Sequence, residues 1–352
     1  MKKILIDLSK MKNLYSGLGQ FSAQFGKYIA ADYANEFEFH FLVPRDHKIS
    51  FSPLVKEVKV NPILRFWKAS HEQYDLWHTL YQFPKYQAPA SFRQILTIHD
   101  LNFLIEKKGS KRDAYQKKLG KEIQRASCIS TISEYTKSQI EAHYPNLDKP
   151  IHVIYNGVES LTQMKPTPPS FLPKKDFFFS ISLFSPKKNF DVLLPMMKYF
   201  PNKQLVIAGN HDNAYGESIK KKIKELGLES QVTLLGIISG AEKAALYEAC
   251  EAFCFPSLAE GFGLPVIEAM QFGKPTFLSN KTSLPEIGGE ASSFFEHFDA
   301  EYMSQIVKDR LAQYHKDPAS QQAHIKSHAA QFTWKKSMHQ YIDLYYATLS
   351  IS

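Results

Sequence analysis

The sequence lacks the features that mark a secreted or membrane-spanning protein. Its 352 residues include three cysteines, Cys128, Cys250 and Cys254, which are too few for a disulfide framework and show no metal spacing. No apolar run approaches the roughly 18 residues that a membrane-spanning helix needs. Residues 1–9 carry Asp7 too early for a signal peptide and fit a buried first strand better. We therefore expect a cytoplasmic protein with reduced cysteines.

Common metal and phosphate motifs are also missing. The chain has no D-x-D, no clustered His, Cys and Asp residues, and no G-x-x-x-x-G-K-[ST] loop. A site that handles a diphosphate here must supply cations and N–H groups from its own residues. We therefore expect no metal and no cofactor.

Positive charge is concentrated in the first half of the chain. Residues 1–165 carry 24 Lys and Arg against 16 Asp and Glu, whereas residues 166–352 carry 19 of each. The basic residues are densest in one run: Lys107, Lys108, Lys111, Arg112, Lys117, Lys118, Lys121 and Arg125. An anionic membrane would attract such a run by about 1 kcal/mol per basic residue, holding the protein peripherally on the inner face. A solvated helix face explains the run equally well. No base-reading module is recognisable, so we expect no nucleic-acid partner.

The pattern of apolar runs predicts two α/β domains. Strand-like runs alternate with helical stretches in both halves, which indicates doubly wound, largely parallel sheets. Residues 162–173 contain four prolines and are predicted to be the interdomain linker. In the second half, strands are expected at 177–183, 204–208, 232–235, 253–255 and 275–279. Ligands bind beyond the carboxyl ends of such strands, so the loops at 184–188, 209–213, 236–239 and 258–263 should converge on one edge.

The loop and helix at residues 260–268 hold the strongest candidate site. Pro265 suits a first helical turn, and the glycines before it allow the backbone to approach a ligand. The N–H groups of a helix start favour an anion. Glu260 lies in the loop and Glu268 about one turn inside the helix, so their carboxylates flank the anion position. A ligand with hydroxyls at both ends and a phosphate between them fits this arrangement, and a nucleotide-sugar is such a ligand.

Other candidates have more than one interpretation. Gly17 and Gly19 form a G-x-G without the third glycine of a dinucleotide fingerprint, so they mark either a tight turn or a backbone approach to a phosphate or sugar. His99 follows the strand at 95–98 and either faces a cleft or is a structural histidine. Lys187 and Lys188 could neutralise a diphosphate or lie on a solvated surface.

The chain resembles the retaining, GT-B-fold glycosyltransferases of family 4. Residues 256–270 look like the E-x7-E signature of that family, and matches at 131–134, 155–158 and 185–189 support the resemblance. The resemblance implies two Rossmann-like domains facing across a cleft. Residues 1–165 would bind the acceptor and residues 172–333 the nucleotide-sugar. Residues 334–352 would form a helix crossing back to the first domain.

The resemblance also implies a role for each candidate residue. The catalytic residues would be Glu260, which contacts the donor sugar, His99, which lies beside it, and Lys188, which binds the diphosphate. Glu268 would hold the ribose. The full set of implied donor-binding residues is Gly17, Gly19, Lys187, Lys188, Gly209, Gly236, Glu260, Gly261, Phe262, Gly263, Leu264 and Glu268.

The implied reaction is metal-independent transfer of a hexose, with retention, from a nucleotide-diphosphate sugar to a glycan or lipid-linked acceptor. Many members carry Gly-Arg where Ser182 and Leu183 stand here, which leaves the donor open. Members with an Arg-Lys-Asn run match better, with Lys187 in place of the arginine. Some of those are mannosyltransferases, so mannose from GDP-mannose is the first candidate. A nucleotide-sugar epimerase and a degenerate sugar-binding protein are the alternatives.

Overall fold

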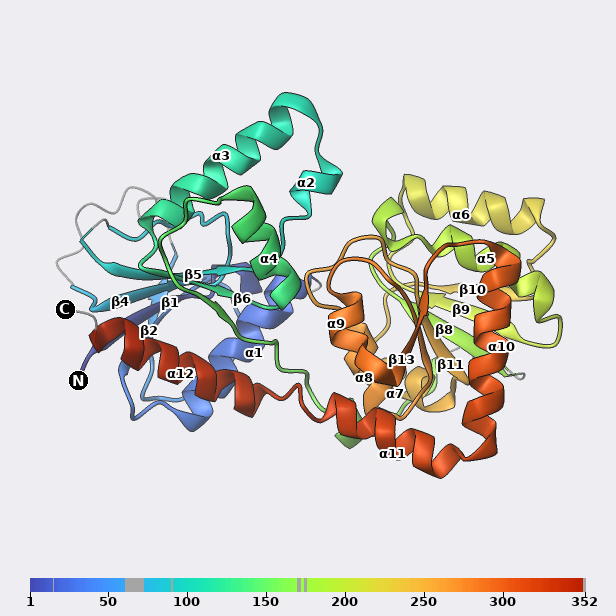
Figure 1. Cartoon of the computed structure of the whole chain (residues 1–352). Helices are drawn as coiled ribbons and strands as arrows, with labels where there is room; N and C mark the ends of the chain where they lie inside the picture. Colours follow the sequence, from blue (N-terminus) through green and yellow to red (C-terminus); the bar gives the residue numbers. More distant parts are fainter. Residues whose placement is uncertain (15, 61–72, 90, 170–171, 174–175, 351–352) are drawn as a thin grey trace. The chain divides into compact units, whose positions relative to one another are not determined.

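The computed structural model describes all residues except 15, 61–72, 90, 170–171, 174–175 and 351–352, and it divides into two compact units (Figure 1). The first unit combines Met1–Gly157 with Thr333–Ser352, and the second spans Val158–Phe332. The chain thus leaves the first unit before the proline-rich stretch where we expected the linker. Leu161 is buried, and the amide of Thr167 donates to the carbonyl of Ala241, so this stretch packs in the second unit. Residues 170–171 of the expected linker lie outside the described residues.

The first unit is built on a parallel sheet with the order β3-β2-β1-β4-β5-β6-β7. Its strands are β1 (Lys3–Asp7), β2 (Glu38–Val43), β3 (Lys56–Lys59), β4 (Leu76–Thr79), β5 (Arg93–Ile98), β6 (Cys128–Thr131) and β7 (Ile151–Val153). Its helices are η1 (Ser9–Lys12), α1 (Gly17–Asp32), α2 (Phe103–Glu106), α3 (Gly109–Arg125), α4 (Glu134–His143) and α12 (Trp334–Ser350).

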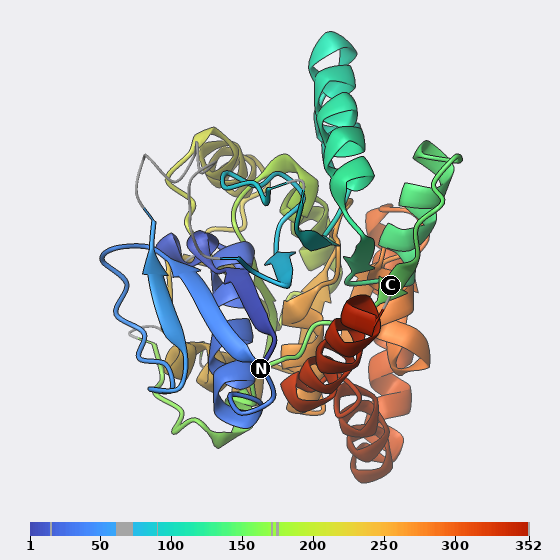
Figure 2. The same ribbon diagram turned by 90° about the vertical axis from the view of Figure 1, so that its left-hand side faces the viewer.

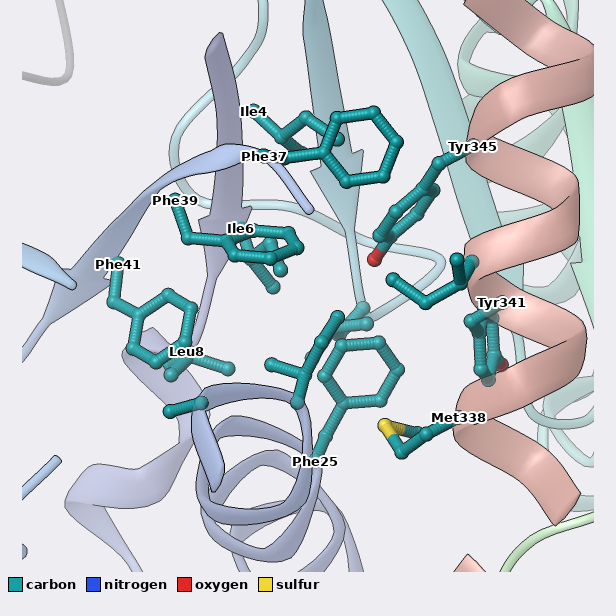
Figure 3. Packing of buried hydrophobic residues seen from close by; sticks show 14 of the residues in the cluster. Ile4, Ile6, Leu8, Phe25, Phe37, Phe39, Phe41, Met338, Tyr341 and Tyr345 are labelled. Carbon is teal, nitrogen blue, oxygen red and sulfur yellow. The ribbon is translucent and has the colours of Figure 1, made fainter. Parts of the chain in front are cut away.

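The core of this unit forms because its central strands are buried on both sides. Ile4, Leu5 and Ile6 of β1 are fully buried, as expected for a parallel strand covered on two faces. Helix α1 begins after Ser16, whose hydroxyl accepts from the amide of Gly19, and packs its Phe25 into the core. Figure 3 shows Ile4, Ile6 and Phe25 meeting between α1 and the strands.

The last helix, α12, is part of this first core. Met338, Tyr341 and Tyr345 recur at helical spacing and point at α1 and the sheet (Figure 3). The hydroxyl of Tyr345 lies 2.7 Å from Nδ1 of His78, which is buried in β4. Arg93 donates to the carbonyl of Thr348 over 3.0 Å and so caps the helix end. Packing, a buried hydrogen bond and a cap therefore all hold the helix in place.

The second unit has a parallel sheet with the order β10-β9-β8-β11-β12-β13. Its strands are β8 (Phe177–Ile181), β9 (Gln204–Ala208), β10 (Val232–Leu235), β11 (Ala252–Phe255), β12 (Thr276–Ser279) and β13 (Ser292–Phe295). Its helices are η3 (Leu161–Gln163), η4 (Pro186–Lys188), η5 (Phe190–Val192), α5 (Leu193–Met196), η6 (Met197–Tyr199), α6 (Ala214–Glu225), α7 (Gly240–Ala249), α8 (Leu264–Gln271), α9 (Leu284–Gly288), η7 (Gly289–Ala291), α10 (Ala300–Lys316) and α11 (Pro318–Ala329).

The prediction of two doubly wound domains is confirmed by these two sheets. In each sheet the first strand of the unit lies between its second and fourth strands, so the winding direction reverses there. Ligands bind outside the carboxyl ends of the strands at this switch point. The switch lies between β1 and β4 in the first unit and between β8 and β11 in the second.

Some elements differ from the expected ones. The apolar pattern of residues 190–199 predicts one helix, but the structure has η5, α5 and η6 there, since Pro195 cannot donate a helical hydrogen bond. Strand β3 was not expected, because its sequence KEVK is mostly exposed and gives no apolar signal. Helix α11 was missed for a similar reason, since it buries only Ile325 and Ala329.

Helix α3 extends from the sheet of its own unit into solvent (Figure 2). Residues 108–118 are exposed apart from the partly buried Gln116, and only the second half of the helix packs on the core through Leu119 and Ile123. In the part of the chain that the structure describes, no helix is both long and apolar enough to cross a membrane.

Candidate functional site

The second unit brings most of the predicted site residues to one switch point. Lys187 and Lys188 follow β8 in the short turn η4, and Glu260 follows β11. Strands β8 and β11 are neighbours in the sheet, and both run with their carboxyl ends toward this edge. Both candidate cations and the first candidate carboxylate therefore lie where a doubly wound sheet binds ligands.

Hydrogen bonds to backbone carbonyls join the loop of Lys187 and Lys188 to the loop that carries Glu260. The carbonyl of Lys187 accepts from the amide of Leu258 over 2.7 Å and from the hydroxyl of Ser257 over 3.1 Å. The side-chain amide of Asn189 donates to the carbonyl of Pro256 over 3.3 Å. Asn189 has a φ of 57°, in the left-handed region that asparagine tolerates better than most residues. These contacts fix where the two lysines stand relative to the loop that carries Glu260.

Lys188 and Glu260 form an ion pair at the centre of the site. The Nζ of Lys188 lies 2.5 Å from Oε1 of Glu260, and only 11% and 14% of the two side chains is exposed. The same ammonium lies 5.3 Å from the centroid of the Phe255 ring. An ammonium has three donors and a carboxylate has two acceptor oxygens, so each partner keeps hydrogen-bonding capacity for a ligand. The pair therefore balances its own charge and still presents a cation and an anion side by side.

The loop after β12 supports Glu260 from behind, a contribution that the sequence did not suggest. The amide of Glu260 donates to the hydroxyl of Thr282 over 3.0 Å, and the hydroxyl of Ser283 reaches the carbonyls of Glu260 and Phe262 at 3.1 and 3.2 Å. Thr282 has a φ of 55°, a strained conformation for a β-branched residue. Extending the strand-end rule from β11 to β12 would have singled out both hydroxyls.

Glu268 has its own set of partners. Its Oε1 lies 2.5 Å from Nζ of Lys243, and its Oε2 accepts from the hydroxyl of Tyr247 over 3.0 Å. Burial, and next the negative charge of Glu268, raises the pKa of Tyr247 well above its usual value, so the tyrosine stays a hydrogen-bond donor. Lys243 and Tyr247 are four residues apart and share one face of α7. That spacing is the signal by which the sequence could have revealed them.

The glycines of the second unit serve different purposes. Gly263 has a φ of 111°, and an added Cβ would lie 2.9 Å from Leu284, so only glycine fits there. Gly209 has a φ of 138°, and its Cβ would lie 1.9 Å from the carbonyl oxygen of Ser182. A Cβ on Gly236 would meet nothing within 4 Å, so this position has open space around it. The protein's own backbone thus accounts for Gly209, and a ligand is not needed to explain it.

Gly261, Phe262 and Leu264 complete the loop that leads into α8. Phe262 is buried with its ring 5.7 Å from that of Phe332, so its side chain is occupied in packing. Leu264 is the first residue of α8, where the early amides have no acceptor within the helix. The loop can therefore offer backbone N–H groups, while the Phe262 ring anchors it.

Gly17, Gly19 and His99 belong to the first unit. Gly17 opens α1, and a Cβ there would meet nothing within 4 Å. A Cβ on Gly19 would lie 1.8 Å from the carbonyl oxygen of Asn13, so glycine is required there by the close approach of the backbone. Packing thus explains Gly19, whereas Gly17 keeps the open surroundings that a ligand would need.

His99 is buried at the carboxyl end of β5. Its Nε2 lies 2.9 Å from the carbonyl oxygen of Leu80, so Nε2 must carry the proton, and its ring meets Phe21 edge-on at 4.8 Å. Burial lowers the pKa of His99 to about 4. At neutral pH the imidazole is therefore uncharged, and it cannot act as a general acid unless a ligand changes its surroundings.

Comparison with protein families matches almost the whole chain. A family model described as glycosyl transferases group 1 matches residues 166–343, which is about half of the chain. A second model, glycosyltransferase family 4, matches residues 28–160. The stretch matched by the first model includes the Lys188–Glu260 pair and Glu268, and the stretch matched by the second includes His99.

Similar proteins include enzymes that are named as mannosyltransferases. The serotype-specific mannosyltransferase WbdA of Escherichia coli is 28% identical over 72% of this chain, but the match spans only 33% of that protein. The O-antigen chain mannosyltransferase B of Escherichia coli is 25% identical, with 97% of this chain and 99% of that protein matched.

A solved structure shares the fold over its full length. Sucrose-phosphate synthase from Thermosynechococcus elongatus has a TM-score of 0.80 at 20% identity, with both chains covered completely. HepE of Anabaena, solved with UDP-glucose, has a TM-score of 0.73 at 17% identity. Together with the two matching models, these likenesses establish that the chain belongs to the GT-B glycosyltransferases of group 1 and family 4.

Proposed function

We propose that the chain transfers a hexose from a nucleotide-diphosphate sugar to a glycan or lipid-linked acceptor, with retention and without a metal. The bond from the sugar C1 to the diphosphate oxygen breaks, and its electron pair leaves with the diphosphate. The acceptor oxygen bonds to C1 on the same face, and its proton passes to the departing phosphate oxygen. The products are a glycoside and a nucleoside diphosphate.

The Lys188–Glu260 pair is the observation that carries this proposal. Negative charge grows on the departing diphosphate, and a fixed cation in a buried site stabilises it better than water does. Lys188 keeps two N–H donors for phosphate oxygens, while the second oxygen of Glu260 can accept from a sugar hydroxyl. Lys187 and the amides at the start of α8 would add further donors. In this arrangement Glu260 orients the donor sugar and does not attack it.

Glu268 is the proposed ribose-binding residue. Lys243 and Tyr247 hold its two oxygens in one orientation, and each oxygen still has a lone pair for a ribose hydroxyl. A carboxylate fixed in this way binds with little loss of side-chain entropy. Lys243 also offsets the negative charge when no ligand is bound.

Mannose is the donor sugar we propose, with GDP-mannose as the donor. The support is the mannosyltransferase activity named for relatives at 25–28% identity. Because the chain spans about a third of WbdA, the donor, acceptor and linkage of that protein do not transfer directly. An epimerase on the same fold is the alternative, and it would convert the donor sugar without any acceptor.

A thermal-shift panel of UDP-, GDP- and ADP-sugars tests the donor. A ligand that binds only the folded state raises the melting temperature, by an amount that follows its affinity. We expect GDP-mannose to give the largest shift. A larger shift with a UDP- or ADP-sugar would overturn the mannose assignment, and sugar interconversion without acceptor would favour the epimerase.

We also propose that the exposed part of α3 holds the protein on an anionic membrane. Lys111 and Arg112 of α3 are exposed, as is Lys108 just before the helix, and Ile105 of α2 and Tyr115 of α3 are 57% and 37% exposed. Basic residues attract anionic headgroups, and exposed apolar side chains can enter the interface. Replacing Lys108, Lys111 and Arg112 by Gln should reduce sedimentation with phosphatidylglycerol vesicles at low salt. Equal sedimentation of the variant would indicate a merely solvated helix face.

A further inference from the structure

An unassigned cluster of aromatic rings and lysines lies at the carboxyl edge of the first sheet. Its members follow three strands that are neighbours around the switch point, β1, β4 and β5. They are Lys10 in η1, Tyr81 and Phe83 after β4, Phe103 in α2, and Tyr115 and Lys118 in α3. The predicted donor residues of this unit, Gly17, Gly19 and His99, are not among them.

The lysines of this cluster lie over the aromatic rings. The Nζ of Lys10 is 3.9 Å from the centroid of the Tyr81 ring, and the Nζ of Lys118 is 5.5 Å from that of Phe83. The Tyr81 and Phe83 rings meet edge-on at 5.9 Å. The two ammonium groups therefore lie over neighbouring rings of one aromatic cluster.

The aromatic surface has a buried side and an open side. Phe83 contacts the buried Phe103 at 5.7 Å and the partly exposed Tyr115 at 5.2 Å. The rings thus form a supported wall with one edge in solvent. Small-molecule sites commonly have this composition, with aromatic walls and a few placed polar groups.

The protein offsets the positive charge of the cluster only in part, since Asp7 attracts Lys10 and Glu122 attracts Lys118. Neither Lys10 nor Lys118 forms an ion pair with any residue that the structure describes. Burial lowers the pKa of Lys10, the attraction of Asp7 offsets part of this, and the repulsion of Lys118 and Lys85 lowers it further. Asp7 is itself buried and accepts from the amide of Ser9. An anion at this place would relieve the mutual repulsion of the lysines.

We propose that this cluster binds a phosphate group on the acceptor. Lys10 and Lys118 would hold the phosphate oxygens, and the rings of Phe83 and Tyr115 would contact the apolar face next to the phosphate. That face is either the C–H side of a sugar or the first part of a prenyl chain. This inference rests on the proposed glycosyl transfer and narrows its acceptor to a phosphorylated sugar or a prenyl phosphate.

Direct binding tests the cluster without any donor. The full chain is titrated with mannose 1-phosphate by calorimetry, and it is sedimented with phosphatidylcholine vesicles that contain polyprenyl phosphate. One of these two probes should bind to the unmodified chain. The variant Lys10→Gln/Lys118→Gln should bind that probe about a hundredfold more weakly, or about tenfold for each charge-assisted hydrogen bond removed. The control Lys12→Gln/Lys27→Gln removes two exposed lysines of the same unit, one in η1 and one in α1, and should bind like the unmodified chain.

The outcomes separate the two sources of phosphate. Binding of mannose 1-phosphate alone identifies a soluble sugar phosphate, and binding of the prenyl vesicles alone identifies a lipid acceptor. Tyr115→Ser should weaken binding of the probe that the unmodified chain binds but leave inorganic phosphate unchanged, because Tyr115 is assigned to the apolar face and inorganic phosphate has none. The proposal is overturned if neither probe binds, or if both lysine variants bind equally.

The donor offers a separate check. If Lys10→Gln/Lys118→Gln weakens GDP as much as it weakens the phosphate probe, the cluster serves the donor and the acceptor assignment is wrong. Loss of donor binding in Glu260→Ala is measured independently in the second unit. The two proposals can therefore fail separately: a lack of glycosyl transfer would not change the result of the phosphate-binding measurement at this cluster.

Discussion

The two sheets share one strand order, yet the charges at their carboxyl edges are balanced in opposite ways. In the second unit each of the two candidate glutamates has a basic partner at 2.5 Å, Lys188 with Glu260 and Lys243 with Glu268. In the first unit Lys10 and Lys118 lie over aromatic rings without an ion pair among the described residues. The two glutamates of the second edge are therefore paired and oriented before a ligand arrives, whereas the two lysines of the first edge have their charge only partly offset.

This difference teaches what each edge can recognise. A site built from lysine–glutamate pairs can bind a ligand that carries both phosphate and hydroxyls, because the lysine donates to phosphate oxygens and the glutamate accepts from hydroxyls. An unpaired cationic site on aromatic rings favours an anion with an apolar neighbour. The same topology thus provides two binding edges, and the side chains after each strand decide their chemistry.

Removing Glu260 should have the largest effect and would test the paired edge directly. We expect Glu260→Ala to reduce kcat by about 100-fold or more, because the donor sugar loses its acceptor and Lys188 loses its orientation. Steady-state transfer assays measure this effect. The exposed Glu248, on α7 near the site, provides the control Glu248→Ala, which should retain full activity. Normal turnover by Glu260→Ala would refute the site assignment.

The ion pair also predicts how the stability of this variant behaves. Glu260→Ala leaves the mostly buried charge of Lys188 without a partner, which destabilises the fold by about 3 kcal/mol. The double variant Glu260→Ala/Lys188→Ala should recover part of this free energy while remaining inactive. Urea unfolding of all variants measures it, and a double variant less stable than Glu260→Ala would mean that Lys188 has other buried partners.

Acid should destabilise the first unit before the second. Burial lowers the pKa of His99 to about 4 and that of His78 to about 3, both below their ordinary 6.5. The unfolded chain therefore binds more protons, and stability is lost as the pH falls from about 6.5 toward 4. For His99 this loss is about 2 kcal/mol between pH 7 and pH 5. Hydrogen exchange measured for each unit at the two pH values should show it, and His99→Gln should reduce it.

The contrast between the sheets also explains what the sequence could reveal. Apolar strand runs such as 177–181 and the Glu260 to Glu268 spacing are local patterns, and the structure places them at the expected edge. The partners of those glutamates are not local. Lys243 and Tyr247 lie more than twenty residues before Glu268 and meet it only after α7 and α8 pack together.

Glycines show a second limit of sequence reasoning. The family resemblance implies that Gly19 and Gly209 bind the donor, yet the carbonyl oxygens of Asn13 and Ser182 already demand glycine there. A glycine in the sequence does not reveal whether the protein's own backbone or a ligand lies against its Cα, because either neighbour leaves no room for a Cβ. The cluster of Lys10 and Lys118 was hidden for a related reason, because its members come from segments that are distant in the chain.

Lys188→Ala would test whether the lysine at the edge of the second sheet contacts the diphosphate. The lysine is proposed to contact the diphosphate but not the nucleoside, so the variant should bind GDP about tenfold more weakly while guanosine binding stays nearly unchanged. Calorimetric titration of both ligands measures the difference. Lys198→Ala removes an exposed lysine of the same unit and serves as the control. Equal loss of both ligands would contradict a diphosphate role.

Tyr247→Phe should have the smallest effect, because it removes one hydrogen bond from Glu268 and leaves Lys243 in place. A buried hydrogen bond to a charged group contributes about 1.5 kcal/mol or more, and the remaining ion pair should limit the loss to about fivefold in donor KM. Since ribose binding is the same in the ground and transition states, kcat should stay nearly constant. Initial rates at varied donor concentration separate the two constants. A fall in kcat with unchanged KM would instead place Glu268 at the reacting sugar, and would exchange the roles assigned to the two glutamates.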